Sequence, residues 1–141
     1  MKVTLEWTGN VGFSATARSF TGIQVDEPHA FHGDDRGPSA AEYLAIGVGG
    51  CLGTSFAYCL QRVEVQPKAI DVSVDVQLHH PADGQPLSIA RMTTSIDVSL
   101  EGGEDEDMLK LCAESFKKYC SVSNSVVAGI PVDVQVKHVR D

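Results

Sequence analysis

An uncharged, glycine-rich segment of 18 residues, 43–60, constrains the fold of this chain more than any other feature. It belongs to an apolar stretch, 39–60, whose single charged residue is Glu42. Pro38 and Ser39 are typical of a helix start, and small or apolar residues on every side predict a long, buried central helix. A glycine inside a helix costs about 1 kcal/mol relative to alanine. The four glycines at 47–53 therefore indicate that another backbone or a ligand passes very close.

A membrane span is an alternative interpretation of the same segment. Its length is sufficient, and Gly49 and Gly53 form a G-x-x-x-G pair. Against this interpretation, the glycines together with Thr54, Ser55 and Tyr58 lower the hydropathy, and the alternating segments on both sides need a packed core. We therefore favour a buried helix in a soluble domain, suited to packing against a symmetry-related copy.

Alternation of apolar and polar residues predicts strands on both sides of this helix. The predicted strands are at residues 2–7, 13–18, 23–26, 70–79, 91–100 and 132–136, with turns at 8–10, 21–22 and 81–86. An amphipathic helix is predicted from about Glu104 to Tyr119, and a short helix at 121–127. One buried and one wet face per strand is typical of antiparallel sheets. The order predicts an α+β fold in one domain, 1–141, with antiparallel sheets around the long helix.

The charge balance and the N-terminus limit the function classes. There are 11 Lys+Arg against 19 Asp+Glu, a net charge of −8, which repels phosphate backbones and argues against nucleic-acid binding. The first residues contain no long apolar stretch, so we expect no signal peptide, a cytoplasmic protein and four free thiols. His29 and His32, in the acidic loop 27–37, are compatible with a weak metal site, but a solvated loop is favoured. We expect no metal and no cofactor.

Two of the four cysteines are candidates for chemistry. Cys59 and Cys112 lie on apolar helical stretches and are interpreted as small core residues. Cys51 lies among glycines, which leave room around its sulfur. Cys120 follows two lysines and precedes a helix start, and both features lower the pKa of a thiol.

Two motifs resemble the signatures of the OsmC/Ohr family, the osmotically inducible and organic-hydroperoxide-resistance proteins. The first runs from Gly-Pro at 37–38 through Glu42 to Gly-Gly-Cys at 49–51. The second is Cys-Ser-Val-Ser-Asn at 120–124, a cysteine opening a short helix with serine nearby. The order of elements is also similar to the family along nearly the whole chain.

The resemblance implies an OsmC-like fold in an intertwined homodimer with two long helices at its centre. It further implies an antioxidant thiol peroxidase of the oxidative stress response. Cys51 would attack the O–O bond of an organic hydroperoxide and become a sulfenic acid, and Cys120 would resolve it as a disulfide. A dithiol, such as a lipoyl group, would then reduce that disulfide. The peroxidase branch also uses an arginine to hold the thiolate, for which Arg18 and Arg36 are both candidates.

The role of Glu42 stays open at this level. Cys51 is nine residues further along, which on a straight helix is ~13 Å along the axis and about half a turn round. Glu42 would therefore shape the thiol site from the partner chain, or through a break of the helix at its glycines. Alternatively, it only favours the first turn of the helix through the dipole.

Two other functions compete with the peroxidase. One is a redox or sulfur-handling protein on the same fold, without peroxidase turnover. The other is a binding module with an apolar pocket at the dimer interface, in which the thiols are incidental. A reactive Cys51 without peroxide turnover would select the former, and inert thiols the latter.

Overall fold

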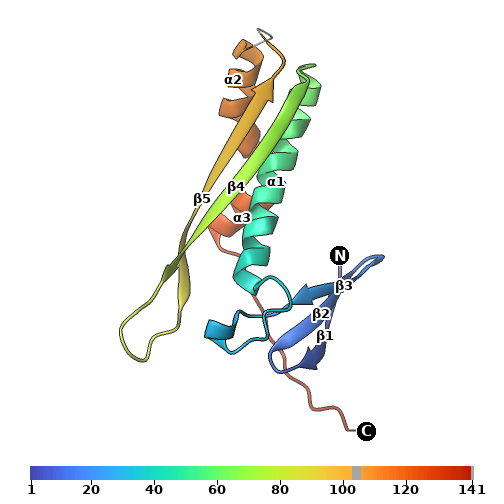
Figure 1. Ribbon diagram of the computed structural model, residues 1–141, viewed down its shortest axis with the longest axis vertical. Coiled ribbons are helices and arrows are strands. Elements are labelled where there is room, and N and C mark those ends of the chain that lie inside the picture. Colours follow the sequence, from blue (N-terminus) through green and yellow to red (C-terminus); the bar gives the residue numbers. More distant parts are fainter. Residues whose placement is uncertain (103–105, 141) are drawn as a thin grey trace. The chain divides into compact units, whose positions relative to one another are not determined.

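The computed structural model describes residues 1–102 and 106–140 (Figure 1). The elements in chain order are β1 Val3–Gly9, β2 Gly12–Ala17, β3 Phe20–Val25, η1 His29–Phe31, α1 Ala40–Arg62, β4 Pro67–His79, β5 Ser88–Leu100, α2 Glu106–Ser115, η2 Phe116–Tyr119 and α3 Ser121–Ala128. Strands β1, β2 and β3 form one sheet, and β4 and β5 pair as a long hairpin. The α+β class with antiparallel sheets is thus confirmed.

The chain divides into two compact units, each made of two segments. The first contains Met1–Gly50 and Asp71–Asp97, and the second contains Cys51–Ile70 and Val98–Asp141. Helix α1 and strands β4 and β5 each contribute residues to both units. That the whole of 1–141 is one domain stays a prediction.

The turn between β2 and β3 lies earlier than the sequence predicts. Ala17 pairs with Phe20, so Arg18 and Ser19 form the turn, and Arg18 adopts a left-handed φ of 57°. The predicted turn at 21–22 is wrong because Gly22, with φ +69°, lies inside β3. There the register shifts and β3 carries one extra residue, a bulge that favours glycine.

A single buried carboxylate organises the loop after β3. Asp26 is 2% exposed. Its oxygens accept hydrogen bonds from the backbone N–H groups of Glu27 at 2.8 Å, Asp34 at 3.4 Å and Arg36 at 3.2 Å. Burial opposes its ionisation, but these donors and the Arg36 side chain hold the pKa of Asp26 below its usual range. The backbone of the loop is therefore fixed around one anion, while the side chains of His29 and His32 are exposed, as expected for a solvated loop.

Helix α1 is continuous from Ala40 to Arg62, as predicted, but one chain buries only one of its faces. The buried stripe repeats every four residues, at Val48, Leu52, Phe56 and Leu60. Ile46 and Tyr58 are each 58% exposed. The prediction that α1 is buried on every side therefore does not hold in the single chain. Because α1 has no polar face, its sequence does not indicate how many of its sides are covered.

At Gly49 a side chain, and not another backbone or a ligand, lies close. A Cβ there would lie 2.7 Å from Cγ2 of Val74 on β4. At Gly47 and Gly50, by contrast, nothing lies within 4 Å. By length and composition alone α1 also resembles a membrane span, since an 18-residue window of it has a mean hydropathy of 1.4. The core helix of a soluble protein meets the same criteria.

The C-terminal third differs from its predicted pattern at two places. The predicted start of the amphipathic helix, Glu104, lies outside the described residues. Its predicted end at Tyr119 is reached in η2, since the helix tightens to 3₁₀ geometry at Phe116. The predicted strand 132–136 is absent from the described residues 129–140. Alternation does not suffice for a strand, because the backbone also needs a neighbouring edge with which to pair.

Candidate thiol site

Cys51 and Cys120 meet within the second unit. Cys51 projects from α1 and is half-buried, whereas Cys120 lies between η2 and α3 and is fully buried. Both are free thiols, and the Cys120 side chain is hydrogen-bonded to Cys51. The two cysteines singled out from the sequence are therefore brought together across 69 residues of chain.

The start of α3 is built around Cys120. Its backbone is extended, with φ −81° and ψ 97°, which makes it the N-cap. Its carbonyl accepts the first helical hydrogen bond, from the N–H of Asn124 at 3.1 Å. The Asn124 side chain donates at 3.3 Å to the carbonyls of Lys117 and Lys118, at the end of η2. This amide thus ties η2 to α3 and fixes the turn that carries Cys120.

The electrostatics of the site favour a thiolate on Cys51. Burial by itself raises the pKa of this thiol. Hydrogen bonds from the Cys120 thiol, the Val122 N–H, the Ser121 hydroxyl and the Ser123 N–H outweigh burial, so the pKa of Cys51 lies below its usual value. The backbone donors are the free N–H groups of the first turn of α3, which carry the positive end of the helix dipole. The N-terminus of α3 therefore favours the ionised form of the Cys51 thiol.

The sequence interpretation missed three of these groups: Ser121, Val122 and Ser123. It placed the helix N-terminus on Cys120 and looked for an arginine to activate Cys51. The available signal was the cysteine directly before the short helix, but which distant side chain receives its N–H groups depends on tertiary packing. Among the described residues of this unit, no arginine contributes to the lowered pKa of Cys51.

The two candidate arginines lie in the first unit. Arg18 is exposed in the β2–β3 turn, with its guanidinium 5.1 Å from the centroid of the Phe20 ring. Arg36 pairs with Asp26 at 3.5 Å and Asp34 at 3.6 Å. A role for either arginine toward Cys51 stays a prediction.

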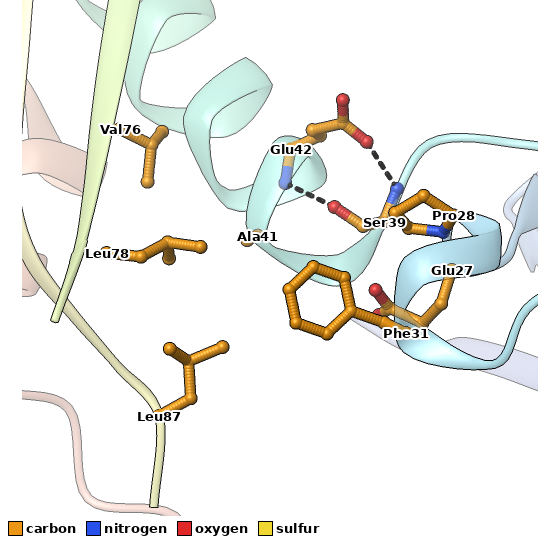
Figure 2. A pocket seen from close by; sticks show the side chains of 9 residues that line it. All are labelled: Glu27, Pro28, Phe31, Ser39, Ala41, Glu42, Val76, Leu78 and Leu87. Carbon is orange, nitrogen blue, oxygen red and sulfur yellow. Dashed lines mark hydrogen bonds between the residues drawn. The ribbon is translucent and has the colours of Figure 1, made fainter. Parts of the chain in front are cut away.

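Glu42 caps the helix on which it lies. Its Oε2 accepts a hydrogen bond from the Ser39 N–H at 2.7 Å, and the Ser39 hydroxyl accepts one from the Glu42 N–H at 3.3 Å (Figure 2). This reciprocal pair is a capping box. The Ser39 backbone, and then its hydroxyl, outweigh burial and lower the pKa of Glu42. Because α1 is unbroken, Glu42 cannot approach Cys51 through a break at the glycines.

An apolar pocket of about 360 Å³ lies beside this cap, within the first unit. In Figure 2, Phe31 points into it from one side, and Val76, Leu78 and Leu87 point into it from the other. The residues that line it are Glu27, Pro28, Phe31, Ser39, Ala41, Glu42, Val76, Leu78 and Leu87. The sequence did not reveal this pocket, since its walls come from segments about 50 residues apart.

The other two cysteines correct the expectation of four free thiols. Cys59 of α1 and Cys112 of α2 form a disulfide, with their Cα atoms 5.7 Å apart. Each lies on an apolar stripe, so the pattern of either helix alone indicates only packing. The described residues contain no cluster of three or more His, Cys, Asp and Glu side chains arranged to hold a metal ion.

The family follows from the sequence. A profile of OsmC-like proteins matches residues 33–135, which include both cysteine motifs. This chain is a member of the OsmC-like protein family. No curated protein is significantly similar to it in sequence.

Solved structures agree on the fold. An OsmC-like protein from Mycoplasma pneumoniae matches with a TM-score of 0.72 and 15% identity, over 89% of this chain and 86% of that one. The organic hydroperoxide resistance protein OsmC of Legionella pneumophila matches at 0.61 and 10%, over 89% and 87%. An organic hydroperoxide resistance protein from Elizabethkingia anophelis matches at 0.60 and 15%, over 88% and 85%. At such identities the likeness shows the fold alone.

Proposed function

We propose that this protein is a cytoplasmic thiol peroxidase that reduces organic hydroperoxides. The observation that carries the proposal is the half-buried Cys51, whose pKa is lowered by α3 and whose sulfur is hydrogen-bonded to a second thiol. A thiolate beside a resolving thiol is the arrangement that peroxide reduction through a sulfenic acid requires. Membership in the OsmC-like family, and the names of two of its structural neighbours, support the choice of substrate.

The chemistry proceeds in three balanced steps. The Cys51 thiolate attacks one peroxide oxygen, the O–O bond breaks, and the alkoxide takes a proton and leaves as an alcohol. Cys51 is then a sulfenic acid. Cys120 attacks the Cys51 sulfur, water leaves, and a disulfide forms. A dithiol of the lipoyl class reduces this disulfide by thiol–disulfide exchange and is itself oxidised to its cyclic disulfide.

The residues of α3 serve the first step. The N–H groups of Val122 and Ser123 stabilise negative charge on the sulfur, which keeps a larger fraction of Cys51 ionised near neutral pH. Cys51 is partly exposed, so a small hydroperoxide can reach it. Cys120 is fully buried and shielded from direct attack, which leaves it free to resolve the sulfenic acid.

We further propose that the protein works as an intertwined homodimer. One face of α1 is exposed in a single chain, and Val132, Val134 and Val136 are exposed and pair with no strand among the described residues. A second copy would cover the helix and supply an edge for this segment. In such a dimer the pocket beside Glu42 would take the apolar group of a hydroperoxide bound at the partner's Cys51. Arg18 or Arg36 would contribute to the same composite site.

Mass spectrometry of the oxidised protein tests the proposal. The protein, purified with Cys51 and Cys120 as thiols, is treated with one equivalent of cumene hydroperoxide, and its disulfides are mapped without reduction. We expect a new Cys51–Cys120 link within one chain, and no peroxide consumption by Cys51→Ser. Consumption at the parent rate by Cys51→Ser would refute the mechanism. Oxidation of Cys51 without turnover in the presence of a dithiol would indicate a redox or sulfur-handling protein instead.

A further inference from the structure

Two cysteine pairs join the same two segments of the second unit at equal spacing. Cys59 follows Cys51 by eight residues on α1, and Cys112 of α2 precedes Cys120, which directly follows η2, by eight residues. The segments therefore run in opposite directions. The hydrogen-bonded pair Cys51 and Cys120 lies at one end of their contact, and the disulfide lies at the other.

An aromatic contact lies between the two pairs. The rings of Phe56 and Phe116 meet edge to face, with centroids 5.2 Å apart and an interplanar angle of 72°. Both phenylalanines are buried, as are Cys112 and Cys120. Along the chain, the segment that carries Cys120 is thus attached to α1 first by the disulfide, then by the aromatic contact, and then by the hydrogen bonds from Cys120 and the first turn of α3 to Cys51.

The disulfide is the strongest of these attachments. Beyond it the chain is constrained again at α3, where the Asn124 amide bonds the carbonyls at the end of η2. Between Cys112 and the first turn of α3, the chain therefore has little freedom while the disulfide is closed. Once it is open, the Phe56–Phe116 contact and the hydrogen bonds to Cys51 still join the two segments, and neither of these attachments is covalent.

We propose that the Cys59–Cys112 disulfide is a positioning cross-link that holds Cys120 and the first turn of α3 against Cys51, so that opening it lowers the reactivity of Cys51. The proposal rests on the proposed function only in taking Cys51 as the reacting thiol. Cys59 and Cys112 are positioning residues, since they act through the segment that carries Cys120. The redox state of one cysteine pair would then set the activity of the other.

Opening the cross-link needs a thiol reductant. A thiolate of a small dithiol attacks Cys59, which is half-buried, and the fully buried Cys112 leaves as a thiolate and takes up a proton. The second thiol of the reductant then displaces Cys59 from the mixed disulfide. The products are two cysteine thiols and the cyclic disulfide of the reductant. Burial of Cys112 should make this reaction slower than reduction of an exposed disulfide.

The alternative is a cross-link with a structural role alone. In that case, loss of the disulfide would lower the stability of the unit but leave Cys51 in each folded molecule as reactive as before. The two roles therefore predict different pH dependences of Cys51 alkylation after loss of the disulfide, but the same change in the unfolding transition.

Alkylation of Cys51 by iodoacetamide, followed by peptide mass spectrometry over a range of pH, separates these roles. The double variant Cys59→Ala/Cys112→Ala lacks the cross-link but keeps Cys51 and Cys120. We expect its Cys51 to react about tenfold more slowly at pH 7 and to need a higher pH for half-maximal rate. The titratable group bonded to Cys51 is Cys120, so its alkylation is quantified separately.

A matched control variant keeps the Cys59–Cys112 disulfide but has a lower free energy of unfolding because of a change close to it. Leu60→Ala removes a fully buried side chain next to Cys59, and we expect it to keep the parent pH profile. The parent protein, fully reduced by a dithiol that is then removed without air, should behave like the double variant. This second form avoids any effect of the substitutions on folding. An unchanged Cys51 profile in both cross-link-free forms would overturn the proposal, as would free thiols at Cys59 and Cys112 in protein purified without reductant.

Hydroperoxide consumption measured on the same samples keeps the two proposals separate. A parent protein that consumes no hydroperoxide, but whose Cys51 alkylation still depends on the second pair, would reject the peroxidase and support the positioning role. If the parent consumes hydroperoxide normally and the alkylation of Cys51 does not depend on the state of Cys59 and Cys112, only the positioning role is rejected.

Discussion

The N-termini of α1 and α3 offer the same free N–H groups to different partners. At α1, Ser39 and Glu42 lie three residues apart and satisfy each other. At α3, no side chain within the helix caps the first turn, and its donors go to Cys51, on another element. The start of α1 is thus closed, in the sense that a carboxylate of the same helix satisfies it. The start of α3 is open, in the sense that its N–H groups donate to a sulfur on another element.

The difference shows how one electrostatic feature serves either stability or chemistry. A carboxylate at the third helical position reaches back and neutralises the positive end of its own helix. Ser123 occupies the equivalent position in α3, and it has no charge with which to do so. The field of α3 is therefore available to lower the pKa of a thiol, which needs a negative charge to react.

Loss of the resolving thiol should produce the largest effect and sharpen the comparison. Cys120→Ser keeps a hydroxyl that can donate to Cys51, so α3 should still activate that thiol. We expect one equivalent of hydroperoxide to be consumed, after which turnover stops, because the sulfenic acid has no thiol to attack it. With excess peroxide, Cys51 should proceed to a sulfinic acid. Peroxide assays and intact-mass measurements check this outcome, and sustained turnover at the parent rate would contradict it.

Loss of the cross-link should have the next largest effect, on stability. The Cys59–Cys112 bond spans 53 residues of sequence. Chain entropy for such a loop predicts a loss of about 4 kcal/mol in the free energy of unfolding for Cys59→Ala/Cys112→Ala. Urea unfolding measures it, with the parent in reducing buffer as the control. If the two differ strongly, the substitutions and not the open bond determine the loss.

Local patterns predicted most of the elements. Helix α1 and the hairpin of β4 and β5 could be predicted because each has a long, uninterrupted pattern. The turn at Arg18 and Ser19 was missed because Gly22, which resembles a turn residue, serves a bulge. The strand predicted at 132–136 is not formed in the single chain, because alternation does not supply a pairing edge.

The thiol site could be predicted in part. Cys51 and Cys120 were named from their neighbours and from the resemblance to OsmC/Ohr signatures. For Glu42, an effect on the first turn of its own helix through the dipole was one of the alternatives, but the hydrogen-bonded cap with Ser39 was not predicted. The Cys59–Cys112 bond and the bonds from α3 to Cys51 could not be read from local patterns, because they join segments more than 50 residues apart. In hindsight, the equal spacing of the two cysteine pairs was a signal that the sequence carried.

A matched pair of substitutions at the closed helix start should have a smaller effect. Ser39→Ala removes the N-cap hydroxyl, and we expect it to lower the free energy of unfolding by about 1 kcal/mol. Glu42→Gln should remove a pH-dependent contribution. Because the pKa of Glu42 is lowered, its contribution is present above the usual glutamate pKa and is lost as pH falls through the lowered value.

The same pair tests whether Glu42 also acts on substrate. Unfolding curves between pH 3 and 7 give the stability effects, and neither variant should change the alkylation of Cys51. Both residues line the pocket, but only Glu42→Gln removes a charge from it, so if the pocket serves a partner's thiol, Glu42→Gln should alter the KM for hydroperoxide more than Ser39→Ala does. Equal kinetics in both variants would restrict Glu42 to capping.

The smallest effect tests the open helix start directly. Ser121→Ala removes one hydroxyl donor to Cys51 and leaves the N–H groups of Val122 and Ser123 in place. We expect alkylation of Cys51 at pH 7 to slow by about two- to tenfold, since one of several donors is lost. The lowered pKa of Cys51 also makes the free energy of unfolding depend on pH. A lowered pKa makes the folded parent gain stability, relative to Cys51→Ala, as pH rises from the lowered value to the usual thiol pKa, and the gain is constant above that. Unfolding of both proteins between pH 6 and 10 should show this rise, and parallel curves would mean that α3 does not stabilise the thiolate.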